Sequence, residues 1–202
     1  MARRTKAEAE QTRQRILMAA LDLFAESGYD QTTFEDVARR IGLTKGAIYW
    51  HFKTKPDLLT ELVSDMTAKH NAELARALST PETLDELVVH FVERARIVVG
   101  KPIGRKFFLM MMRMDWPSAK LTPIKRRLRE VKTNPFSVIE SALVLFQQKG
   151  HIRADADLAC ATMTLGALWL GAMKMQIDDC HAIDLSKTIT LGFKAVIDSI
   201  RT

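Results

Sequence analysis

The stretch that decides the fold covers residues 28–55 and reads GYDQTTFEDVARRIGLTKGAIYWHFKTK. Its first half carries the apolar stripe of a short amphipathic helix, at positions i, i+3, i+4 and i+7: Phe34, Val37, Ala38 and Ile41. Thr33, with Asp36 three residues later, suits the N-cap of this helix. The competing N-cap pair is Thr32 with Glu35. Gly42 suits the end of the helix, because a left-handed terminal residue costs glycine no Cβ clash.

A second short helix follows, and Thr44 suits its N-cap. Its inward face needs only three residues, Ala47, Ile48 and Phe52. The remaining face carries Tyr49, Trp50 and His51 in succession, which a solvated helix rarely does. Two short helices joined at a glycine therefore predict a helix-turn-helix whose second helix lies on DNA. An exposed, partly aromatic helix in an ordinary bundle is the alternative.

The side chains of this second helix and its surroundings suit the DNA backbone and the base edges. Hydroxyl, phenol, imidazole and ammonium groups bind phosphate oxygens, and a glycine permits close approach to a base. We expect phosphate contacts from Thr33, Thr44, Tyr49, His51 and Lys55. We expect base contacts from Lys45, Gly46, Ala47 and Tyr49. The predicted DNA-binding set is completed by Trp50 and by an N-terminal arm of Arg3, Arg4 and Lys6.

The N-terminal third of the chain resembles the DNA-binding domain of the TetR/AcrR family of bacterial repressors. The resemblance rests on Ile16-Leu17, Leu23-Phe24, Gly28, Thr32-Thr33, Val37-Ala38, Gly42-Leu43, Lys55, Leu58 and above all Gly46-Ala47-Ile48-Tyr49-Trp50-His51-Phe52. The opening Ala2-Arg3-Arg4-Thr5-Lys6 is similar to the multidrug-efflux repressors within that family. Beyond about residue 68 the resemblance is only architectural. It implies a ligand-responsive repressor that binds pseudo-palindromic double-stranded DNA as a homodimer.

The whole chain has helical periodicity, and no segment alternates as a strand would. We expect an all-α fold of about nine helices, with a helix-turn-helix DNA-binding domain in residues 1–55 and a ligand-binding and dimerisation domain in residues 56–202. Three of the later helices are expected to start at Thr80-Pro81, at Asp155, and at Asp184 or Ser186. The apolar pattern of residues 122–150 favours one helix kinked at Pro135, although Asn134-Pro135 could restart a second helix.

Composition excludes several other classes of protein. The 202 residues are 47% hydrophobic, and no run approaches the roughly 18 uninterrupted apolar residues that span a bilayer. The polar, basic N-terminus does not look like a signal peptide, so we expect a cytoplasmic protein with Cys160 and Cys180 as reduced thiols. The five histidines are scattered, and no glycine-rich phosphate loop follows a strand. We therefore expect no enzyme activity, no cofactor and no metal.

The formal net charge of +6 is unevenly distributed. Residues 1–55 hold ten Lys/Arg against seven Asp/Glu, and residues 101–132 hold ten against two. Phosphate neutralisation explains the first excess. The second is consistent with a solvated helix face, an extra attraction to DNA, or a site for an anionic ligand.

Residues from about 156 to 177 are expected to form a helix that is apolar nearly all round, so more than one side must be covered. Two faces are visible, the first made by Leu158, Ala161, Leu165, Leu168, Ala172 and Met175. The second is made by Thr162, Gly166, Trp169 and Met173. The resemblance implies that this helix and residues 186–200 pair with their mates in a homodimer. Burial within a monomer is the alternative.

A methionine-rich run in residues 107–116 suits a promiscuous pocket, because methionine repacks around differently shaped partners. We expect a hydrophobic, aromatic small-molecule effector, with Arg113 and Asp115 as candidate polar anchors. The predicted ligand-binding residues are Phe107, Met110, Met111, Met114, Trp116, Phe146, Trp169 and Met173. Ordinary core packing explains the same residues. Two rival functions stay open, a DNA-binding protein without a small-molecule effector and an all-α carrier or enzyme that retains the fold.

Overall fold

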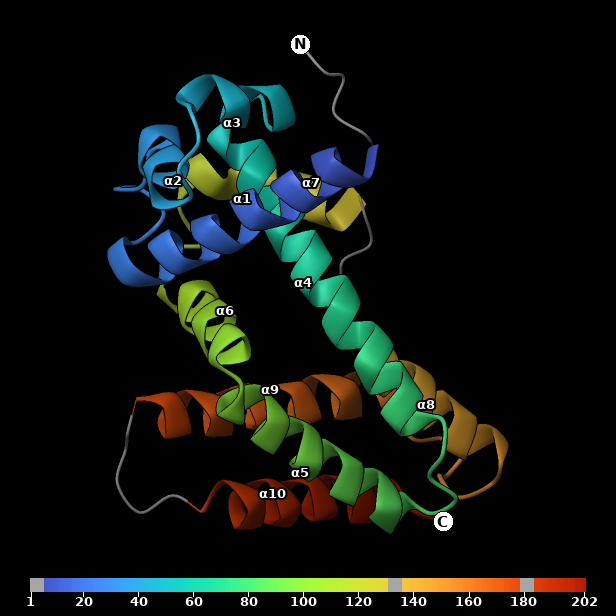
Figure 1. Ribbon diagram of the computed structural model, residues 1–202. Coiled ribbons are helices and arrows are strands. Elements are labelled where there is room, and N and C mark those ends of the chain that lie inside the picture. The colour runs from blue at the N-terminus through green and yellow to red at the C-terminus, as the bar shows by residue number, and fades with distance from the viewer. Residues whose placement is uncertain (1–5, 131–135, 179–183) are drawn as a thin grey trace. The chain divides into compact units, whose positions relative to one another are not determined.

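The computed structural model describes residues 6–130, 136–178 and 184–202, and helix dominates all three ranges. Apart from one isolated antiparallel bridge, no β-structure occurs in these ranges. The predicted all-α fold is confirmed. The elements are α1 (Lys6–Ser27), α2 (Phe34–Arg40), α3 (Lys45–His51), α4 (Lys55–Leu78), α5 (Leu84–Gly100), α6 (Pro102–Arg113), the 3-10 helix η1 (Ala119–Leu121), α7 (Thr122–Glu130), α8 (Ser137–Gln148), α9 (Leu158–Ile177) and α10 (Leu185–Ile200) (Figure 1).

The described residues contain ten α-helices rather than nine, because the helix expected across residues 122–150 is divided. Its two parts are α7 and α8, and Phe136 precedes the first turn of α8 without a side-chain cap. The expected kink at Pro135 lies outside the described residues.

The chain divides into two compact units. Unit 1 comprises Met1–Thr67 and Lys106–Thr133, and unit 2 comprises Ala68–Arg105 and Asn134–Thr202. Of the three boundaries between the units, one falls within α4, one within α6, and one outside the described residues, between Thr133 and Asn134. This division differs from the predicted functional boundary after residue 55, which stays a prediction.

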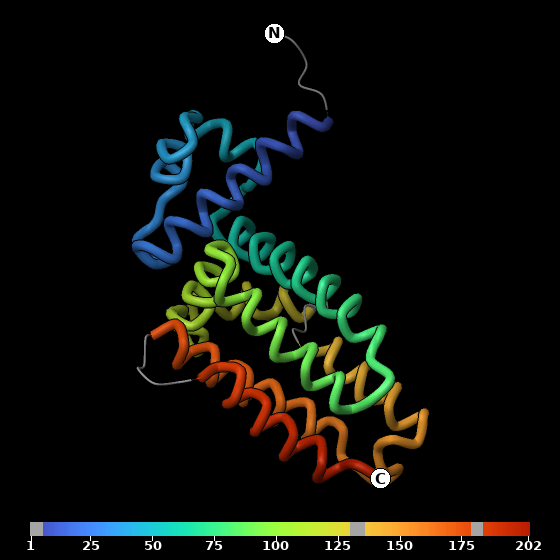
Figure 2. Tube along the Cα trace, turned by 60° about the horizontal axis from the view of Figure 1, so that its bottom comes forward, coloured from blue at the N-terminus to red at the C-terminus, as the bar shows by residue number. Residues whose placement is uncertain are grey.

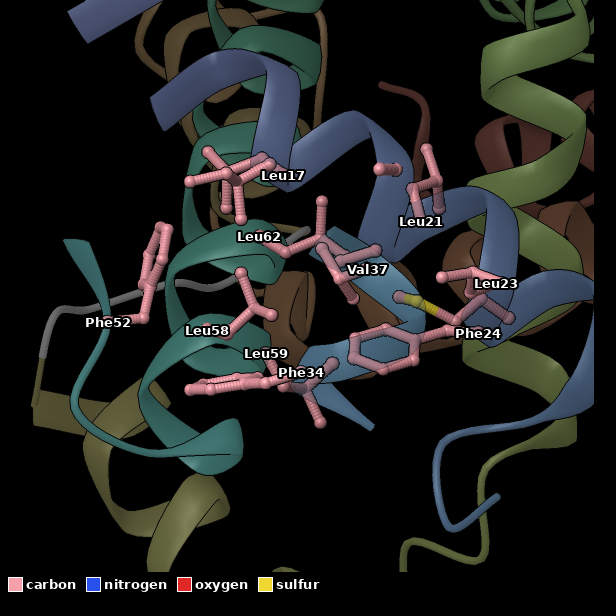
Figure 3. Packing of buried hydrophobic residues seen from close by; sticks show 14 of the residues in the cluster. Leu17, Leu21, Leu23, Phe24, Phe34, Val37, Phe52, Leu58, Leu59 and Leu62 are labelled. Carbon is pink, nitrogen blue, oxygen red and sulfur yellow. The ribbon is translucent and has the colours of Figure 1, made fainter. Parts of the chain in front are cut away.

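Unit 1 is built around one apolar core. Side chains of α1, α2 and the first half of α4 point into it, among them Leu17, Phe24, Val37, Leu58 and Leu62 (Figure 3). Each of these side chains stabilises the unit by about 1.5–3 kcal/mol when fully buried. Three residues from the later segment, Met110, Leu121 and Ile124, are buried in the same cluster. The segment after residue 106 is therefore part of the core that carries the helix-turn-helix.

In unit 2, α10 packs against both α5 and α9, and α8 packs against α9 (Figures 1 and 2). The buried stripe of α10 consists of Leu185, Ile189, Phe193, Ile197 and Ile200. The ring of Phe193 meets the edge of Phe91 from α5, with 5.0 Å between ring centroids. Aromatic pairs of this geometry add to the stabilisation from area burial alone.

Helix caps explain where several helices begin. Thr33 and Asp36 form the expected capping box of α2, whereas the hydroxyl of Thr32, its competitor, donates instead to the carbonyl of Gly28 at 2.8 Å. The hydroxyl of Thr54 accepts from the backbone N–H of Asp57 at the start of α4. The expected cap of α10 by Asp184 is confirmed.

Two of the expected helix starts are wrong. The carboxylate that caps α9 belongs to Asp157, which accepts from the backbone N–H of Cys160 at 2.9 Å, and not to Asp155. The cap of α5 is Thr83 and not Thr80. In both places a second polar residue two or three positions away offers the same capping chemistry, so residue type and spacing alone do not decide between them.

Candidate DNA-binding site

The second helix of the helix-turn-helix, α3, is fixed at both ends and by one internal anchor. The hydroxyl of Thr44 accepts from the backbone N–H of Ala47 at 3.2 Å, and the N–H of Phe52 bonds to the carbonyl of Ile48 at 2.9 Å. Ile48 is the one fully buried residue of α3. Gly42 precedes the helix with φ +67°, the left-handed conformation expected for it. These local constraints leave most of α3 free to face outward.

The outward face of α3 carries the aromatic residues singled out in the sequence. Tyr49 is 47% exposed and Trp50 is 68% exposed. The ring of Tyr49 rests edge-on against Phe34 at 5.0 Å, and Trp50 lies edge-on to His51 at 4.5 Å. These contacts orient the rings without burying them. Tyr49 and Trp50 are thus available to a partner, whereas His51 is half-buried.

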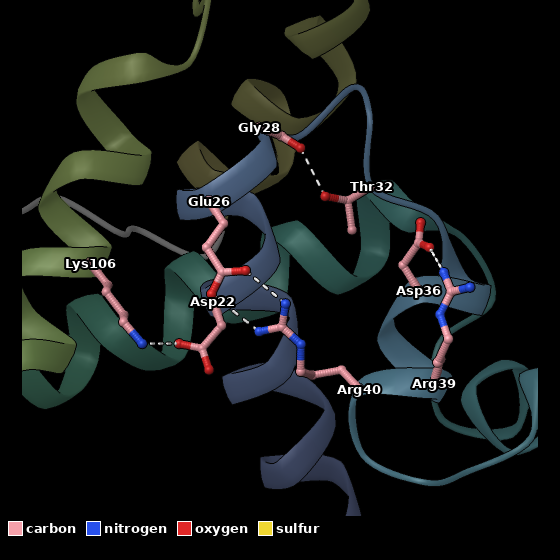
Figure 4. A network of polar contacts seen from close by, with 8 residues as sticks. All are labelled: Asp22, Glu26, Gly28, Thr32, Asp36, Arg39, Arg40 and Lys106. Atoms are coloured by element: carbon pink, nitrogen blue, oxygen red, sulfur yellow. Dashed lines mark hydrogen bonds and ion pairs between the residues drawn. The ribbon is translucent and has the colours of Figure 1, made fainter.

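A network of charged side chains holds α2 beside α1 (Figure 4). Arg40 of α2 makes two hydrogen bonds to Glu26 of α1, at 2.7 and 3.2 Å. Lys106 pairs with Asp22 at 2.6 Å and so ties α6 to the other side of α1. Hydrogen bonds from Thr33 lower the pKa of Asp36, which also pairs with Arg39. The network holds α2 in place, and α2 carries Phe34, the residue that the ring of Tyr49 contacts.

Lys55 has a different environment from the one expected of a phosphate ligand. Its ammonium donates to the backbone carbonyls of Tyr29, Asp30 and Thr32, at 2.8, 3.2 and 3.0 Å. It also lies 4.4 Å from the centroid of the Tyr29 ring, and burial lowers the pKa of Lys55. All three N–H bonds are therefore used within unit 1. This geometry argues against the predicted phosphate contact and assigns Lys55 to holding the loop between α1 and α2.

The other predicted DNA-binding residues fall into three groups. Arg3 and Arg4 lie outside the described residues. Four residues are exposed, Lys6, Thr44, Lys45 and Gly46, and Ala47 is half-buried. Thr33 is exposed, but its hydroxyl donates to Asp36 at 2.7 Å and accepts from the same residue, so it serves the cap of α2.

The predicted ligand-binding residues are divided between the two units. Phe107, Met110, Met111, Met114 and Trp116 pack in or against the core of unit 1. Phe146 and Met173 are fully buried in unit 2, where Trp169 is half-buried. Neither candidate polar anchor points to a ligand, since Arg113 donates to the carbonyl of Ala25 at 3.0 Å and Asp115 is exposed. A hollow of about 400 Å³ exists in unit 1, but other residues line it: Leu23, Ser27, Gln31, Thr32, Asp36, Arg39 and Arg40.

Unit 2 contains a half-buried polar cluster that was not predicted from the sequence. The guanidinium of Arg94 donates to Nδ1 of His70 at 3.3 Å and pairs with Glu73 at 2.5 Å. The ring centroid of His70 lies 5.9 Å from that of Trp169, with the two rings tilted by 52°, and burial, with the charge of Arg94, lowers the pKa of His70 to about 4. Arg94 interrupts the apolar face of α5, three residues after Phe91, which is the signal that could have revealed it.

The buried atoms of unit 2 that lack a hydrogen-bond partner among the described residues include one on α5 and one on α9. They are Nε of Arg94 and the hydroxyl oxygen of Thr162 on α9, and both are buried. A buried polar group without a partner costs about 1–3 kcal/mol, and such groups are uncommon in native proteins. Unit 2 therefore has hydrogen-bonding capacity that its own described residues leave unused.

The surface of α9 has an apolar stripe of helical period. It consists of Ala159, Cys160, Met163, Thr164, Ala167, Leu168, Gly171, Lys174 and Met175. Both faces expected from the sequence are largely buried within unit 2, and the exposed stripe combines Leu168 and Met175 of the first face with residues assigned to neither. Leu191 of α10 is 76% exposed, and Leu168 lies against Gly192 of the same helix.

Two capped short helices, a left-handed glycine between them and an exposed Tyr-Trp pair define a helix-turn-helix DNA-binding protein. The model of the TetR family of bacterial regulatory proteins matches residues 16–62. The chain is 46% identical to the transcriptional regulator SrpR of Pseudomonas putida over 158 residues, which cover 78% of this chain and 71% of SrpR. The chain therefore belongs to the TetR family, and it is a DNA-binding transcriptional repressor.

Two further relatives extend the likeness. The regulator AcrR of Shigella flexneri is 41% identical over 99 residues, and this match spans only 46% of each chain. The complex of SmeT with triclosan superposes with a TM-score of 0.79 at 27% identity, covering 95% of this chain and 92% of SmeT. SmeT is the repressor of the Stenotrophomonas maltophilia multidrug efflux pump SmeDEF. Relatives of this chain thus include a regulator of multidrug efflux.

Proposed function

We propose that the chain is a homodimeric repressor that leaves a pseudo-palindromic operator when a hydrophobic small molecule binds it. The exposed Tyr-Trp face of α3 carries this proposal. In the helix-turn-helix geometry such a face lies in the major groove, and two copies read half-sites about one helical turn or a multiple of it apart. Lys45, Gly46 and Tyr49 would meet base edges, and Thr44 and His51 would meet phosphates.

The second copy is proposed to cover the apolar stripe of α9 and the neighbouring part of α10. Met163, Leu168, Met175 and Leu191 are large apolar side chains that are 39–76% exposed. Contiguous exposed apolar surface of this kind marks an interface. By length and composition α9 would also pass as a membrane span, with a mean hydropathy of 1.3, but one such helix is weak evidence. A dimer interface accounts for the same composition in a cytoplasmic DNA-binding protein.

Two observations support the response to an effector. SmeT was solved in complex with triclosan. Unit 2 of this chain also has buried hydrogen-bonding atoms without a described partner, on Arg94 and Thr162, which a ligand with a polar group would satisfy. For 100-fold release of the operator, the effector must prefer the non-binding state by roughly 2.7 kcal/mol. Arg94 and Thr162 replace Arg113 and Asp115 as the candidate polar anchors.

The experiment that tests DNA binding and release is fluorescence anisotropy with a labelled duplex from the region upstream of the protein's own gene. We expect saturable binding that excess unlabelled operator, but not scrambled DNA, reverses. Triclosan is the first probe, followed by a panel of apolar and amphiphilic compounds. Specific binding that no compound reverses would favour the rival without an effector, and no specific binding by folded protein would favour a carrier or enzyme.

Ligand binding is measured separately by tryptophan fluorescence. The chain has three tryptophans, Trp50 on α3, Trp116 in unit 1 and Trp169 in unit 2. In the double variant W50F/W116F, emission reports only on Trp169 beside His70. A titratable change in this variant would support an effector site in unit 2. A flat response to every compound that releases DNA would contradict that site.

A further inference from the structure

The basic segment after residue 106 belongs to the unit that carries the helix-turn-helix. Leu121 and Ile124 are buried in the same core as α1, α2 and α4. Arg127 of α7 pairs with Asp57 in the first turn of α4, only five residues after Phe52. Burial works to raise the pKa of Asp57, but hydrogen bonds from Arg127 and Thr54 outweigh it and lower that pKa. This ion pair holds α7 beside the start of α4 (Figure 1). The start of α4 in turn follows the end of α3 closely in the chain.

This segment supplies the whole net charge of unit 1. Residues 1–67 hold ten Lys/Arg and ten Asp/Glu, so they are formally neutral. Residues 106–133 hold eight Lys/Arg and two Asp/Glu, a net charge of +6. The remaining residues, which form unit 2, hold twelve of each, so +6 is also the net charge of the protein. The excess of three positive charges in residues 1–55 is thus cancelled within unit 1 by Asp57, Glu61 and Asp65 of α4.

Several basic side chains of α1 and of the helix-turn-helix are also engaged within unit 1. Arg13, Arg39 and Arg40 pair with Glu61, Asp36 and Glu26. The ammonium of Lys55 donates to three carbonyls. Lys45 and Lys53 remain exposed at the two ends of α3. DNA affinity depends on how many phosphates a protein neutralises, so further exposed basic side chains in unit 1 would strengthen binding beyond what these lysines and the predicted N-terminal arm provide.

The basic side chains of η1 and α7 are placed to add to them. Lys120, Arg126 and Arg129 are exposed, and Lys125 is half-exposed. The charge of Lys120 acts together with burial to lower the pKa of Lys55, so this end of the face lies near the loop between α1 and α2. We define these four residues as the α7 basic face. The ion pair of Arg127 with Asp57 holds the helix that carries this face beside the start of α4, which follows α3 in the chain.

We propose that the α7 basic face is a second DNA-binding surface, which contacts the sugar-phosphate backbone flanking the groove that α3 occupies. The inference rests on the proposed docking of α3. Phosphate contacts are independent of sequence, so this face sets the affinity and its salt dependence, whereas α3 selects the site.

The test compares the full chain with its triple variant K120Q/K125Q/R129Q, which keeps Arg127 and its ion pair with Asp57. Anisotropy is measured on an operator duplex and on a scrambled duplex between 50 and 200 mM salt. Loss of three phosphate contacts makes the plot of log K against log salt shallower by about 2.7, since each contact contributes about 0.9. Affinity for both duplexes falls by the same factor, because phosphates carry no sequence information.

A matched control removes the same charge from unit 2. Lys101, Lys149 and Lys187 are exposed there, and K101Q/K149Q/K187Q is expected to keep the salt slope of the natural protein. The charge-retaining variant K120R/K125R/R129K is expected to keep it as well. Circular dichroism of each variant establishes that the helices are intact.

Equal salt slopes for the natural chain and the α7 variant would overturn the inference, and the face would then fit an acidic protein partner instead. An equal reduction in the unit 2 control would also overturn it, because net charge rather than a surface would be responsible. If the natural chain binds neither duplex, the proposed docking of α3 fails together with the inference. If it binds the operator normally and only the α7 prediction fails, the function of α3 stands.

Discussion

Helices α3 and α9 both leave an unusual surface uncovered, and the chemistry of the two surfaces differs. The exposed face of α3 has a phenol and an indole, from Tyr49 and Trp50, with Lys45 and Lys53 at its ends. The exposed stripe of α9 has aliphatic carbon and sulfur, from Leu168 and Met175 among others, and Lys174 is its single charged residue. A contiguous exposed apolar surface indicates an interface, whereas the polar groups on it indicate the kind of partner.

The two helices also differ in how they are held. Helix α3 has seven residues, and one of them is fully buried, so its exposed residues contribute little to folding. Helix α9 has twenty residues and a buried face that packs against three helices, α5, α8 and α10. Substitutions on the two exposed faces should therefore spare the fold and disrupt different assemblies.

The largest expected effect comes from charges placed on the exposed stripe. In the variant M163D/L191D, dimerisation would bury two carboxylates from each protomer without partners, which is far costlier than leaving them in water. We expect a monomer by light scattering. We also expect operator affinity to fall by more than about 100-fold, because a monomer binds a single half-site.

Val89 offers the control for this variant. It is 64% exposed and apolar like the residues of the stripe, but it lies on α5. V89D is expected to keep the dimer and the operator affinity. A dimeric M163D/L191D protein, or a monomeric V89D protein, would contradict the assignment of the interface to α9 and α10.

The next prediction contrasts a change of stability at the buried residue of α3 with a change of DNA affinity at its exposed face. Ile48 is fully buried, so I48A should lower the free energy of unfolding by about 2–4 kcal/mol. Trp50 is exposed, so W50A should change it by less than about 0.5 kcal/mol. The same W50A variant should bind the operator roughly 10- to 100-fold more weakly, an effect on the scale of a binding hot spot.

Urea denaturation and anisotropy on the same preparations separate the two effects. Y49A extends the test, because Tyr49 is predicted to meet a base as well as the backbone. Selection of bound fragments from random DNA should recover an altered site preference for Y49A. An unaltered preference, with normal affinity, would remove Tyr49 from the base-reading set.

The sequence predicted α3 well because its determinants are local. Thr44, Gly42 and the single anchor Ile48 all act within a few residues of one another. The same holds for the capping box of Thr33 and Asp36. Short-range chemistry of this kind can be inferred from spacing alone.

Features that depend on distant contacts were not predictable in the same way. Lys55 bonds to carbonyls 23–26 residues away, and no periodicity reveals that its ammonium is occupied. Ile124 and Leu121 join the core of the helix-turn-helix from beyond residue 106. On α9, helical periodicity defines the possible faces, but the positions of α5, α8 and α10 decide which face stays exposed.

His70 of α4, which lies beside Trp169 of α9, gives a prediction of how stability depends on pH. Burial, with the charge of Arg94, lowers the pKa of His70 from 6.5 to about 4, although Glu73 opposes the shift. The unfolded chain then takes up the proton at higher pH than the folded chain. The stability from neutral His70 is therefore complete above about pH 6.5 and is lost as the pH falls toward 4.

The loss should be on the order of 1–3 kcal/mol, as the size of the pKa shift implies. Urea denaturation of the natural protein and of H70Q at pH 7, 5.5 and 4.5 measures it as a difference, which removes the contribution of the carboxylates. The natural protein should lose more stability than H70Q over this range. Parallel losses would mean that His70 is not held neutral beside Trp169.

The smallest expected effects distinguish Lys53 from Lys55, the two lysines on either side of Thr54 between α3 and α4. Lys53 is exposed beside α3, so K53Q should remove one phosphate contact and make the salt slope shallower by about 0.9, with stability unchanged. Lys55 donates to three carbonyls, so K55Q should cost about 1–2 kcal/mol of stability and leave the salt slope as it is. K55Q should lower operator affinity only indirectly. Loss of the carbonyl contacts would loosen the loop between α1 and α2, and with it α2, whose Phe34 contacts Tyr49. A shallower salt slope for K55Q at unchanged stability would return Lys55 to the DNA-binding set and show that its carbonyl contacts are exchanged for a phosphate on DNA.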